Sequence, residues 1–492
     1  MPQSDISYSF DTGNYILATE DYSIKDHRPH TPGYFLYIKL LDTASLFTKD
    51  SYSAYFFLSN LFIALSVPFL FLILRNWIGK AETIFICLVF ITNPIIWFYA
   101  NVPETYPFDV LFSLSLVYVG TERKYSLLIL PILALGAGVR ISSGVLLIPV
   151  ALYLLYKSWI SKDIKVGGFL LSLILSIIIF LAWFVPMIYQ TDGISTWLRL
   201  MSEHNPFPDN REVFSLVSIL KNSFYVFLYI VIFIGATLIS FVTMLFYHKE
   251  NTMSINKRSI LQTALIWLVP GLLFFILYYY VKGYLLLLAG GFYLLLAIPF
   301  LTRRAYSIIF IIAIGLQFLY FFCFPYVDPG LNYHYKTLRD NLSSNELISS
   351  RILSDLSFTY SQLSALDRRY SDVEKGINEI IHNNYINRTV LIDPSVNVFA
   401  RSFQPKYPEI RFAEIPPVFD DNYQYFVGLD SKTVDGFKDD LDNMIVISTV
   451  ESDELYFKDM KELIHIINGV TFSLPKPEKK DEIFKIYSDL CK

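Results

Sequence analysis

The sequence predicts a polytopic α-helical membrane protein with a small α/β domain at its C-terminal end. Three observations support this fold class. Of the 492 residues, 54% are hydrophobic and 17% are charged, whereas soluble domains carry about a quarter charged residues. The shortage of charge is confined to residues 52–324, where several apolar runs reach the roughly 20 residues that cross a bilayer core. The remaining residues have a soluble composition.

The apolar region divides at its charged residues into about ten predicted spans. They lie near 52–75, 82–99, 104–120, 125–139, 141–157, 166–189, 221–247, 260–281, 284–301 and 305–324. Three domains are therefore expected: an N-terminal segment 1–51, a helical membrane domain 52–325 and a soluble domain 326–492.

Positive charge orients these spans, because cytoplasmic loops of membrane proteins are enriched in Lys and Arg. Alternate connections hold 12 basic residues, namely Arg75, Lys80, Arg123, Lys124, Lys157, Lys162, Lys165, Lys249, Lys257, Arg258, Arg303 and Arg304. The opposite connections hold at most 5, namely Arg140, Arg199, Arg211, Lys221 and Lys282. The first side is predicted to be cytoplasmic. Residues 1–51, the loop 190–220 and everything after 325 are then extracytoplasmic.

The N-terminal segment shows no signal peptide, and a polar segment of this length does not readily cross a membrane by itself. We therefore expect a further span ahead of it, which gives eleven spans in a complete chain. The alternative is that ten spans are complete and that the segment itself is translocated.

Four ionisable residues lie at or near the predicted external ends of spans: Glu104, Asp109, Arg140 and Lys282. Such residues at membrane depth are costly and usually functional. An ion-coupled transporter needs them midway across the membrane, whereas an enzyme at the outer surface needs them at this level. Arg140 requires an anion or several carbonyls, and a phosphate fits its planar fork. Lys282 could instead be an interfacial anchor, and Asp109 could satisfy a neighbouring helix.

The stretch 11–41, ahead of the first apolar run, is polar, aromatic and rich in turn residues. Its second half predicts an amphipathic helix, with Lys39, Asp42 and Thr43 on one face and Tyr34, Phe35, Ile38 and Leu41 on another. This pattern is typical of a helix that lies in the membrane interface. Such a helix would hold Asp11 at the level of the lipid headgroups.

This stretch resembles the first external loop of the membrane-embedded C-type glycosyltransferases (GT-C) that use polyprenyl-phosphate sugars. Protein O-mannosyltransferases and lipid A aminoarabinose transferases belong to that superfamily. Its members place an acidic residue soon after the first span, then an aromatic and alanine-containing helix, then a proline-rich turn. The corresponding residues here are Asp11, "YILAT" and "HRPHTPGYFLYI".

Further segments resemble the superfamily in the same order along the chain: "NPIIWFYANVPETYPFDVLFSL", "LALGAGVRISSGVLLIPVAL", "VKGYLLLLAGGFYLLLAIP" and "VFARSFQPKYPEIRF". Two departures stand out. The pair of acids expected in many members is not clear, because Thr12 and Gly13 follow Asp11, and Asp5 is an alternative acid. Lys282 stands where many relatives carry another polar residue.

The resemblance implies inverting transfer of a sugar from a polyprenyl phosphate to an acceptor hydroxyl. Asp11 is then the expected general base, with Glu104 as a second acid that positions acceptor or sugar. Arg140 and Lys282 are expected to stabilise the departing phosphate. His30, Tyr284 and Arg211 are the further expected substrate-binding residues. A monophosphate donor needs no divalent metal in principle, because cationic side chains can meet its charge.

His27 and His30 have an H-x-x-H spacing, but zinc requires three or four ligands and Pro29 prevents a regular helix across the pair. We expect no metal site there. His30 is expected to form hydrogen bonds within the Pro-Gly turn, and His27 to be a solvated loop residue. The three cysteines show neither a disulfide framework nor a metal-ligand spacing.

The predicted loop 190–220 is long for a mere connection, which suggests a lid or an acceptor contact. Trp197, His204 and Arg211 could meet sugar or phosphate there. The alternative is a short amphipathic helix and a Pro-rich turn without a catalytic part.

The C-terminal domain is predicted from short β-branched runs, "RTVLIDPSV", "EIRFAEI" and "NMIVIST", that follow polar helices over 334–385. The stretch "DELYFKDMKELIHIINGV" has helical periodicity, and "EIFKIYSDL" is expected to close the sheet as a strand. About 160 residues can bury a core of their own. Nothing in this domain indicates catalysis.

The function that this pattern favours is a glycosyltransferase at the outer face of a prokaryotic cytoplasmic membrane. Its expected partners are the polyprenyl-phosphate sugar, membrane lipid and a glycan, lipid or protein acceptor. A net charge of −4 gives no indication of nucleic-acid binding. Three alternatives stay open: a polysaccharide polymerase or ligase with a diphosphate-linked donor, a lipid or sugar transporter, and an inactive relative that serves as a scaffold.

Overall fold

The computed structural model describes most of the chain. The described residues are 10–203 except 103, 215–234, 255–278, 282–298, 307–326, 357–415 except 384, 386 and 397, 424–427 and 430–491. Two compact units are present. One comprises Met1–His30 together with Phe324–Lys492, and the other comprises Thr31–Cys323.

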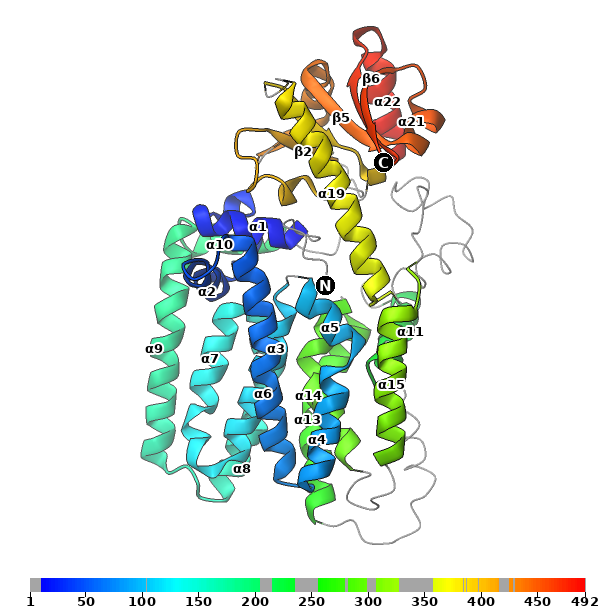
Figure 1. Ribbon diagram of the computed structural model, residues 1–492. Helices are drawn as coiled ribbons and strands as arrows, with labels where there is room; N and C mark the ends of the chain where they lie inside the picture. The colour runs from blue at the N-terminus through cyan, green and yellow to red at the C-terminus, as the bar shows by residue number, and fades with distance from the viewer. Residues whose placement is uncertain are drawn as a thin grey trace. The chain divides into compact units, whose positions relative to one another are not determined.

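The second unit is a bundle of helices (Figure 1). Its elements are α2 (Phe35–Ser45), α3 (Ser51–Arg75), α4 (Lys80–Ile91), α5 (Pro94–Asn101), α6 (Tyr106–Thr121), η2 (Arg123–Leu128), α7 (Ile129–Val139), α8 (Ile141–Ile160), α9 (Val166–Gln190), α10 (Ile194–Glu203), α11 (Leu216–Ile234), α13 (Ile255–Leu277), η4 (Lys282–Leu288), α14 (Ala289–Ala297) and α15 (Ser307–Cys323). Each of the ten predicted spans contains one or more of these helices.

The helices have the apolar composition of a multi-pass membrane protein. Among the described residues five helices are long and apolar enough to cross a bilayer, or six if the bent pair α4 and α5 forms one span. Four shorter apolar segments accompany them: Tyr106–Thr121, Lys124–Val139, Gly283–Ala297 and Ile311–Cys323. The total of ten spans stays a prediction, and part of the predicted span 221–247 lies outside the described residues.

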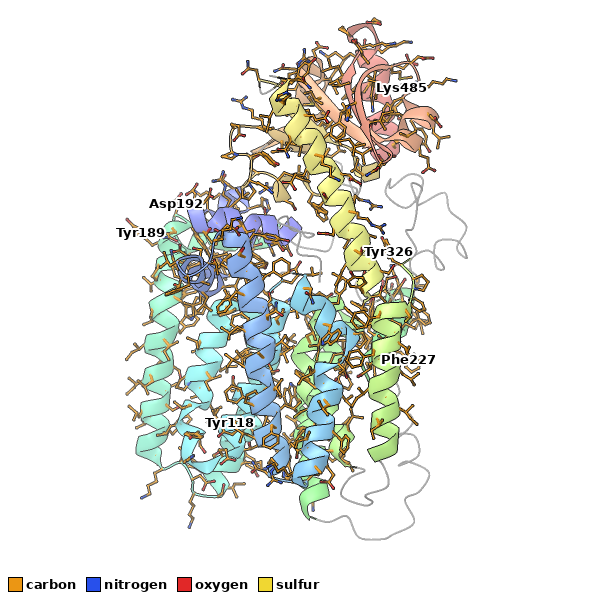
Figure 2. All side chains as sticks on the ribbon, viewed as in Figure 1. Tyr118, Tyr189, Asp192, Phe227, Tyr326 and Lys485 are labelled. Carbon is orange, nitrogen blue, oxygen red and sulfur yellow. The ribbon has the colours of Figure 1, made fainter. Side chains whose placement is uncertain are left out.

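Two connections that were predicted on opposite sides of the membrane lie at opposite ends of this unit. Tyr118, near the end of α6, is at one end of the bundle, and Tyr189 and Asp192, where α9 finishes, are at the other (Figure 2). The placement of these two connections therefore agrees with the predicted topology. Which end faces the cytoplasm stays a prediction.

The bend of 52° between α4 and α5 is fixed by Asn93, which is fully buried. Its Oδ1 caps α5 by accepting hydrogen bonds from the backbone N–H groups of Ile95 (3.0 Å) and Ile96 (3.3 Å). Its Nδ2 donates to the carbonyl of Phe233 (2.6 Å) and to the hydroxyl of Tyr293 (3.1 Å). One side chain thus pairs with the free backbone N–H groups at the start of α5 and connects the break to α11 and α14.

Helix α2 confirms the predicted amphipathic helix. Its buried face is formed by Phe35, Tyr37, Ile38, Leu41 and Ala44. Lys39 and Thr43 are exposed on the other side. Figure 1 shows α2 almost end-on, at a steep angle to the bundle helices of its unit, as expected of a helix that does not cross the membrane.

The first unit is an α/β domain to which the N-terminal residues belong. Its elements are α1 (Phe10–Glu20), η1 (Ile24–Asp26), α19 (Tyr360–His382), β1 (Thr389–Ile392), η7 (Pro394–Val396), η8 (Ala400–Ser402), β2 (Phe412–Glu414), β3 (Gln424–Val427), β4 (Asp430–Thr433), α20 (Val434–Asp440), η9 (Leu441–Asn443), β5 (Met444–Thr449), α21 (Val450–Tyr456), β6 (Lys461–Ile467), β7 (Val470–Pro475), η10 (Pro477–Lys479) and α22 (Lys480–Cys491).

The strands form one sheet in the order β4-β3-β2-β1-β5-β7-β6. β1 runs parallel to β2 and β5, and the outer pairs are antiparallel. A core of buried apolar residues joins the sheet to α20 and α22, with Leu391 and Val446 facing Phe437, Ile483 and Tyr487. The predicted α/β composition of this domain and its strands β1, β2 and β5 are confirmed.

Two expectations for this domain were wrong. The stretch predicted as one helix up to residue 470 is helical only in α21 and then forms the hairpin β6–β7. Asn468 (φ 48°) and Gly469 (φ 86°) make its two-residue turn, a backbone conformation that Asn-Gly favours. The stretch expected as a closing strand is helix α22, in which Ile483, Tyr487 and Leu490 are buried at helical spacing.

The division of the chain also differs from the predicted boundary at residue 51. Residues up to His30 group with the C-terminal domain, whereas α2 groups with the membrane helices. The predicted N-terminal domain 1–51 is therefore split between two compact units. The reason is tertiary packing, since α1 lies against η8, which comes almost 400 residues later.

Candidate functional site

Arg140 lies at the junction of α7 and α8 and is buried, with a side chain that is 4% exposed. Its NH1 forms an ion pair with Asp109 of α6, whose side chain is fully buried. Ser143, one turn further along α8, also interacts with this carboxylate. The anion that Arg140 was expected to need is thus supplied within the protein, and the pair has no net charge.

The guanidinium of Arg140 is also held between two aromatic rings. It lies 4.8 Å from the ring centre of Tyr106 and 4.4 Å from that of Tyr284. Cation–π contacts of this kind are stronger when water is excluded. The Nε of Arg140 is buried and has no hydrogen-bond partner among the described residues. Arg140 therefore retains a donor that a ligand oxygen could accept from.

Glu104 lies in the connection between α5 and α6 and is 8% exposed. Its carboxylate acts electrostatically on Tyr106 and on Tyr37 of α2. Burial raises the pKa of Tyr37 above its ordinary value, and the charge of Glu104 adds to that effect. Tyr106 thus has Glu104 and Arg140 close by, and three of the predicted site residues, Glu104, Arg140 and Tyr284, surround it.

The beginning of α2 approaches the same place. Tyr34, which precedes α2 in a left-handed conformation (φ 46°), is close enough to Arg140 to interact with its charge. The carbonyl of Pro32 in the preceding turn accepts a hydrogen bond from Nε1 of Trp197 (3.0 Å), which lies on α10. The predicted loop 190–220 therefore contains a helix that contacts the Pro-Gly turn through Trp197.

An apolar groove of about 450 Å³ runs between α7, α8 and α9. Ile141, which follows Arg140 in the chain, and Ala137, three residues before it, contribute to its lining, as do Phe184 and Trp197. Its lining is almost entirely apolar, which suits a hydrocarbon chain and not a sugar.

Asp11 lies in the first turn of α1, where a carboxylate is favoured by the helix dipole. Its side chain is 38% exposed, and its Oδ1 lies 3.3 Å from Nδ1 of His30, which is 10% exposed. The ring of Tyr15 lies beside that of His30, with centres 5.8 Å apart. The structure therefore brings two predicted site residues together, an accessible carboxylate and a buried imidazole.

The remaining predicted site residues are not described to the same extent. Lys282 begins η4, two residues before Tyr284, and only its backbone is described. Arg211 and His204 lie outside the described residues. Among the described residues no group of three or more His, Cys, Asp or Glu side chains could hold a metal ion.

Sequence reasoning missed Tyr106, Tyr34 and the pairing of Asp109 with Arg140. A signal for the pairing was present, because opposite charges inside apolar spans usually pair with one another. No local pattern distinguishes Tyr106 from the other tyrosines, which number 35 in this chain.

No protein-family model matches the sequence, and no curated protein matches it either. Two solved structures do match. The crystal structure of ArnT from Cupriavidus metallidurans in the apo state has a TM-score of 0.55 and 12% sequence identity, and covers 95% of this chain and 94% of that one. The crystal structure of the same protein bound to undecaprenyl phosphate has a TM-score of 0.57 and 12% identity, covering 96% and 94%.

ArnT is an aminoarabinose transferase with the GT-C fold. This chain has the GT-C fold as well. The likeness extends over nearly the full length of both chains, so it includes the membrane helices and the C-terminal domain. The resemblance stated from the sequence is thereby confirmed for the fold.

Proposed function

We propose that this protein is a glycosyltransferase that takes its sugar from a polyprenyl-phosphate donor at the outer face of a prokaryotic cytoplasmic membrane. The observation that carries the proposal is the likeness to ArnT over 95% of the chain, one of the two matching structures being bound to undecaprenyl phosphate. The groove of about 450 Å³ between α7, α8 and α9 supports it further, since its apolar lining suits a polyprenyl chain.

The proposed reaction inverts the anomeric carbon. The acceptor oxygen attacks that carbon as the bond from the carbon to the phosphate oxygen breaks, and the electron pair of that bond leaves with the phosphate. The acceptor proton passes to a carboxylate, for which Asp11 is our candidate because it is accessible and lies beside His30. His30 then holds the carboxylate in place and stabilises its charge.

The leaving phosphate gains negative charge, which cationic groups in a water-poor site stabilise. Arg140 is proposed to contact it through the N–H groups that Asp109 leaves unused, and Lys282 to add a positive charge. Because the pair of Arg140 and Asp109 is neutral overall, Lys282 is the residue proposed to supply the net positive charge beside the phosphate. Glu104 and Tyr284 are proposed to position the sugar or acceptor, and Arg211 to bind substrate. No divalent metal takes part in this scheme.

The test uses membranes that contain the full chain, supplied with radiolabelled sugars on a set of polyprenyl-phosphate donors. Asp11→Asn is compared with Asp21→Asn, a matched control in the same segment whose side chain is 68% exposed and paired with Arg28 at 3.1 Å. We expect transfer by the wild type and by Asp21→Asn, and a loss of at least about a hundredfold in Asp11→Asn, in line with the usual contribution of a general base.

Equal transfer by Asp11→Asn and the wild type would remove Asp11 from the proposal and direct attention to Asp5 or Glu104. Absence of transfer from every monophosphate donor, with transfer from a diphosphate-linked oligosaccharide, would replace it by a polymerase or ligase. Transfer from neither class, by a protein that is folded, would refute the enzymatic proposal.

A further inference from the structure

The C-terminal domain buries an arginine that forms hydrogen bonds with the N-terminal segment. Arg401, in η8, is 2% exposed. Its NH1 donates hydrogen bonds to Oδ1 of Asn14 in α1 (2.8 Å) and to the carbonyl of Asp26 in η1 (3.3 Å). A buried guanidinium is costly unless it is well bonded, and these two bonds of Arg401 reach the N-terminal segment.

The backbones of α1 and η8 also lie against each other. A Cβ added to Gly13 would stand 2.8 Å from the carbonyl oxygen of Arg401 and 3.2 Å from the backbone nitrogen of Ser402. Because these neighbours are backbone atoms, they cannot move aside as a flexible side chain could. Gly13 therefore permits a close approach that no other residue would allow, and Asn14 beside it is fully buried.

η8 is in turn attached to the sheet by Glu414, at the end of β2. The Oε2 of Glu414 accepts a hydrogen bond from the backbone N–H of Ala400 (2.7 Å), and its carboxylate also accepts from the backbone N–H of Arg401. The charge of Glu414 faces the guanidinium of Arg401. The position of η8 is thus fixed by the sheet, and the position of α1 is fixed by η8.

Asp11 lies two residues before Gly13 and three before Asn14 on the same helix. Its own side chain is 38% exposed, so its position depends on the packing of α1 and not on burial of the carboxylate itself. We propose that Arg401 is a positioning residue for Asp11, through which the C-terminal domain sets the place of the general base. This inference rests on the proposed function, in which Asp11 is that base.

The experiment measures two quantities on the full chain in detergent micelles or nanodiscs. The first is hydrogen exchange of the backbone amides of α1 and, for comparison, of the central strand β5. The second is the transfer of sugar, with kcat and the donor KM determined separately. The variants are Arg401→Met, Arg401→Lys and Gly13→Ala. The matched control is Arg388→Met, which removes another NH1 donor of this domain, bonded to the carbonyl of Asp442 at 3.2 Å.

We expect exchange in α1 to become about tenfold to a hundredfold faster in Arg401→Met, as the loss of charged hydrogen bonds implies. Arg401→Lys should recover part of the protection, and Arg388→Met should leave α1 unchanged. Gly13→Ala should also speed exchange in α1, although alanine favours helix more than glycine does. In the transfer assay kcat should fall by about a hundredfold with little change in the donor KM, because only the base is misplaced.

Unchanged exchange of α1 in both Arg401→Met and Gly13→Ala would overturn the inference. If Arg401→Met also speeds exchange in β5, the C-terminal domain of that variant is unfolded. Gly13→Ala then tests the inference alone, since it changes no residue between 326 and 492. Faster exchange of α1 with an unchanged kcat would likewise overturn the positioning role. If the wild type itself transfers no sugar, the proposed function and this positioning role fall together, while the exchange data still show whether Arg401 holds α1.

Discussion

The ion pair between Asp109 and Arg140 permits a test that separates folding from function. Both side chains are buried, at 0% and 4% exposure. Removing one partner of a buried pair typically costs about 3–5 kcal/mol, because the other charge is left without its partner. Replacing both at once leaves neither charge buried without its partner, so most of that cost is avoided. Asp109→Asn and Arg140→Gln should therefore each destabilise the helical unit, and the double variant should recover most of the loss.

The assay is the midpoint of thermal unfolding in detergent, measured as the fraction of protein that stays monodisperse after heating. For a unit of this size about 3–5 kcal/mol corresponds to a fall of roughly 10 °C. Glu122→Gln is the matched control, since Glu122 accepts a hydrogen bond from Asn76 (2.9 Å) at the other end of α6 and is not buried. That variant should change the midpoint by no more than about 2 °C.

Two results would refute this reasoning. One is an unchanged midpoint in Asp109→Asn, and the other is a double variant whose loss equals the sum of the two single losses. A double variant that is stable can then be tested for sugar transfer. Loss of transfer would assign Arg140 a part in the reaction, whereas retained transfer would limit Arg140 to neutralising Asp109.

Three further predictions concern stability. Burial raises the pKa of Glu414 from 4.5 to about 7, so the folded domain binds the proton of Glu414 more tightly than the unfolded chain does. The free energy of unfolding of the domain should therefore fall by about 3 kcal/mol as the pH rises from about 4.5 to 7, at about 1.4 kcal/mol per unit of pKa. Hydrogen exchange of β5 between pH 4.5 and 8 measures this, and Glu414→Gln should abolish the dependence; a dependence that persists in the variant would assign it to other groups. Gly376→Ala should destabilise the domain by about 1–3 kcal/mol, because its Cβ would lie 1.8 Å from the ring of Phe472; an unchanged urea midpoint for exchange of β7 would contradict this. Asn93→Ala should lower the thermal midpoint of the helical unit by several degrees, since it removes a helix cap and the buried hydrogen bond to the carbonyl of Phe233; an unchanged midpoint would contradict the stabilising role of Asn93.

The membrane helices and α2 could be predicted because their information is local. An apolar run of sufficient length or an amphipathic repeat is visible in a short window, whatever the rest of the chain does. The hairpin β6–β7 also had a local signal, Asn468-Gly469, which the helical periodicity of the preceding residues obscured. Helix α22 was mistaken for a strand because its apolar residues form a short run, which fits the period of a strand as well as that of a helix.

The arrangement of the site could be predicted only in part. Asp109 and Arg140 are 31 residues apart, and Asn14 and Arg401 are 387 apart. Such contacts follow from tertiary packing and leave no periodic trace in one sequence. The type of residue did carry information, since rare charges in apolar surroundings were identified as functional candidates. The partners of these charges could be identified only from the folded structure.

The contact of Asn14 with Arg401 has a consequence for the time at which the protein matures. Ribosomes add about 5–20 residues each second, so the 387 residues between the two side chains take roughly 20–80 s to synthesise. During that interval α1 has no η8 to pack against, and the carboxylate of Asp11 has no fixed position. A nascent chain whose membrane helices are already synthesised therefore carries an Asp11 whose surroundings are incomplete, and only the last third of translation supplies the residues that complete them.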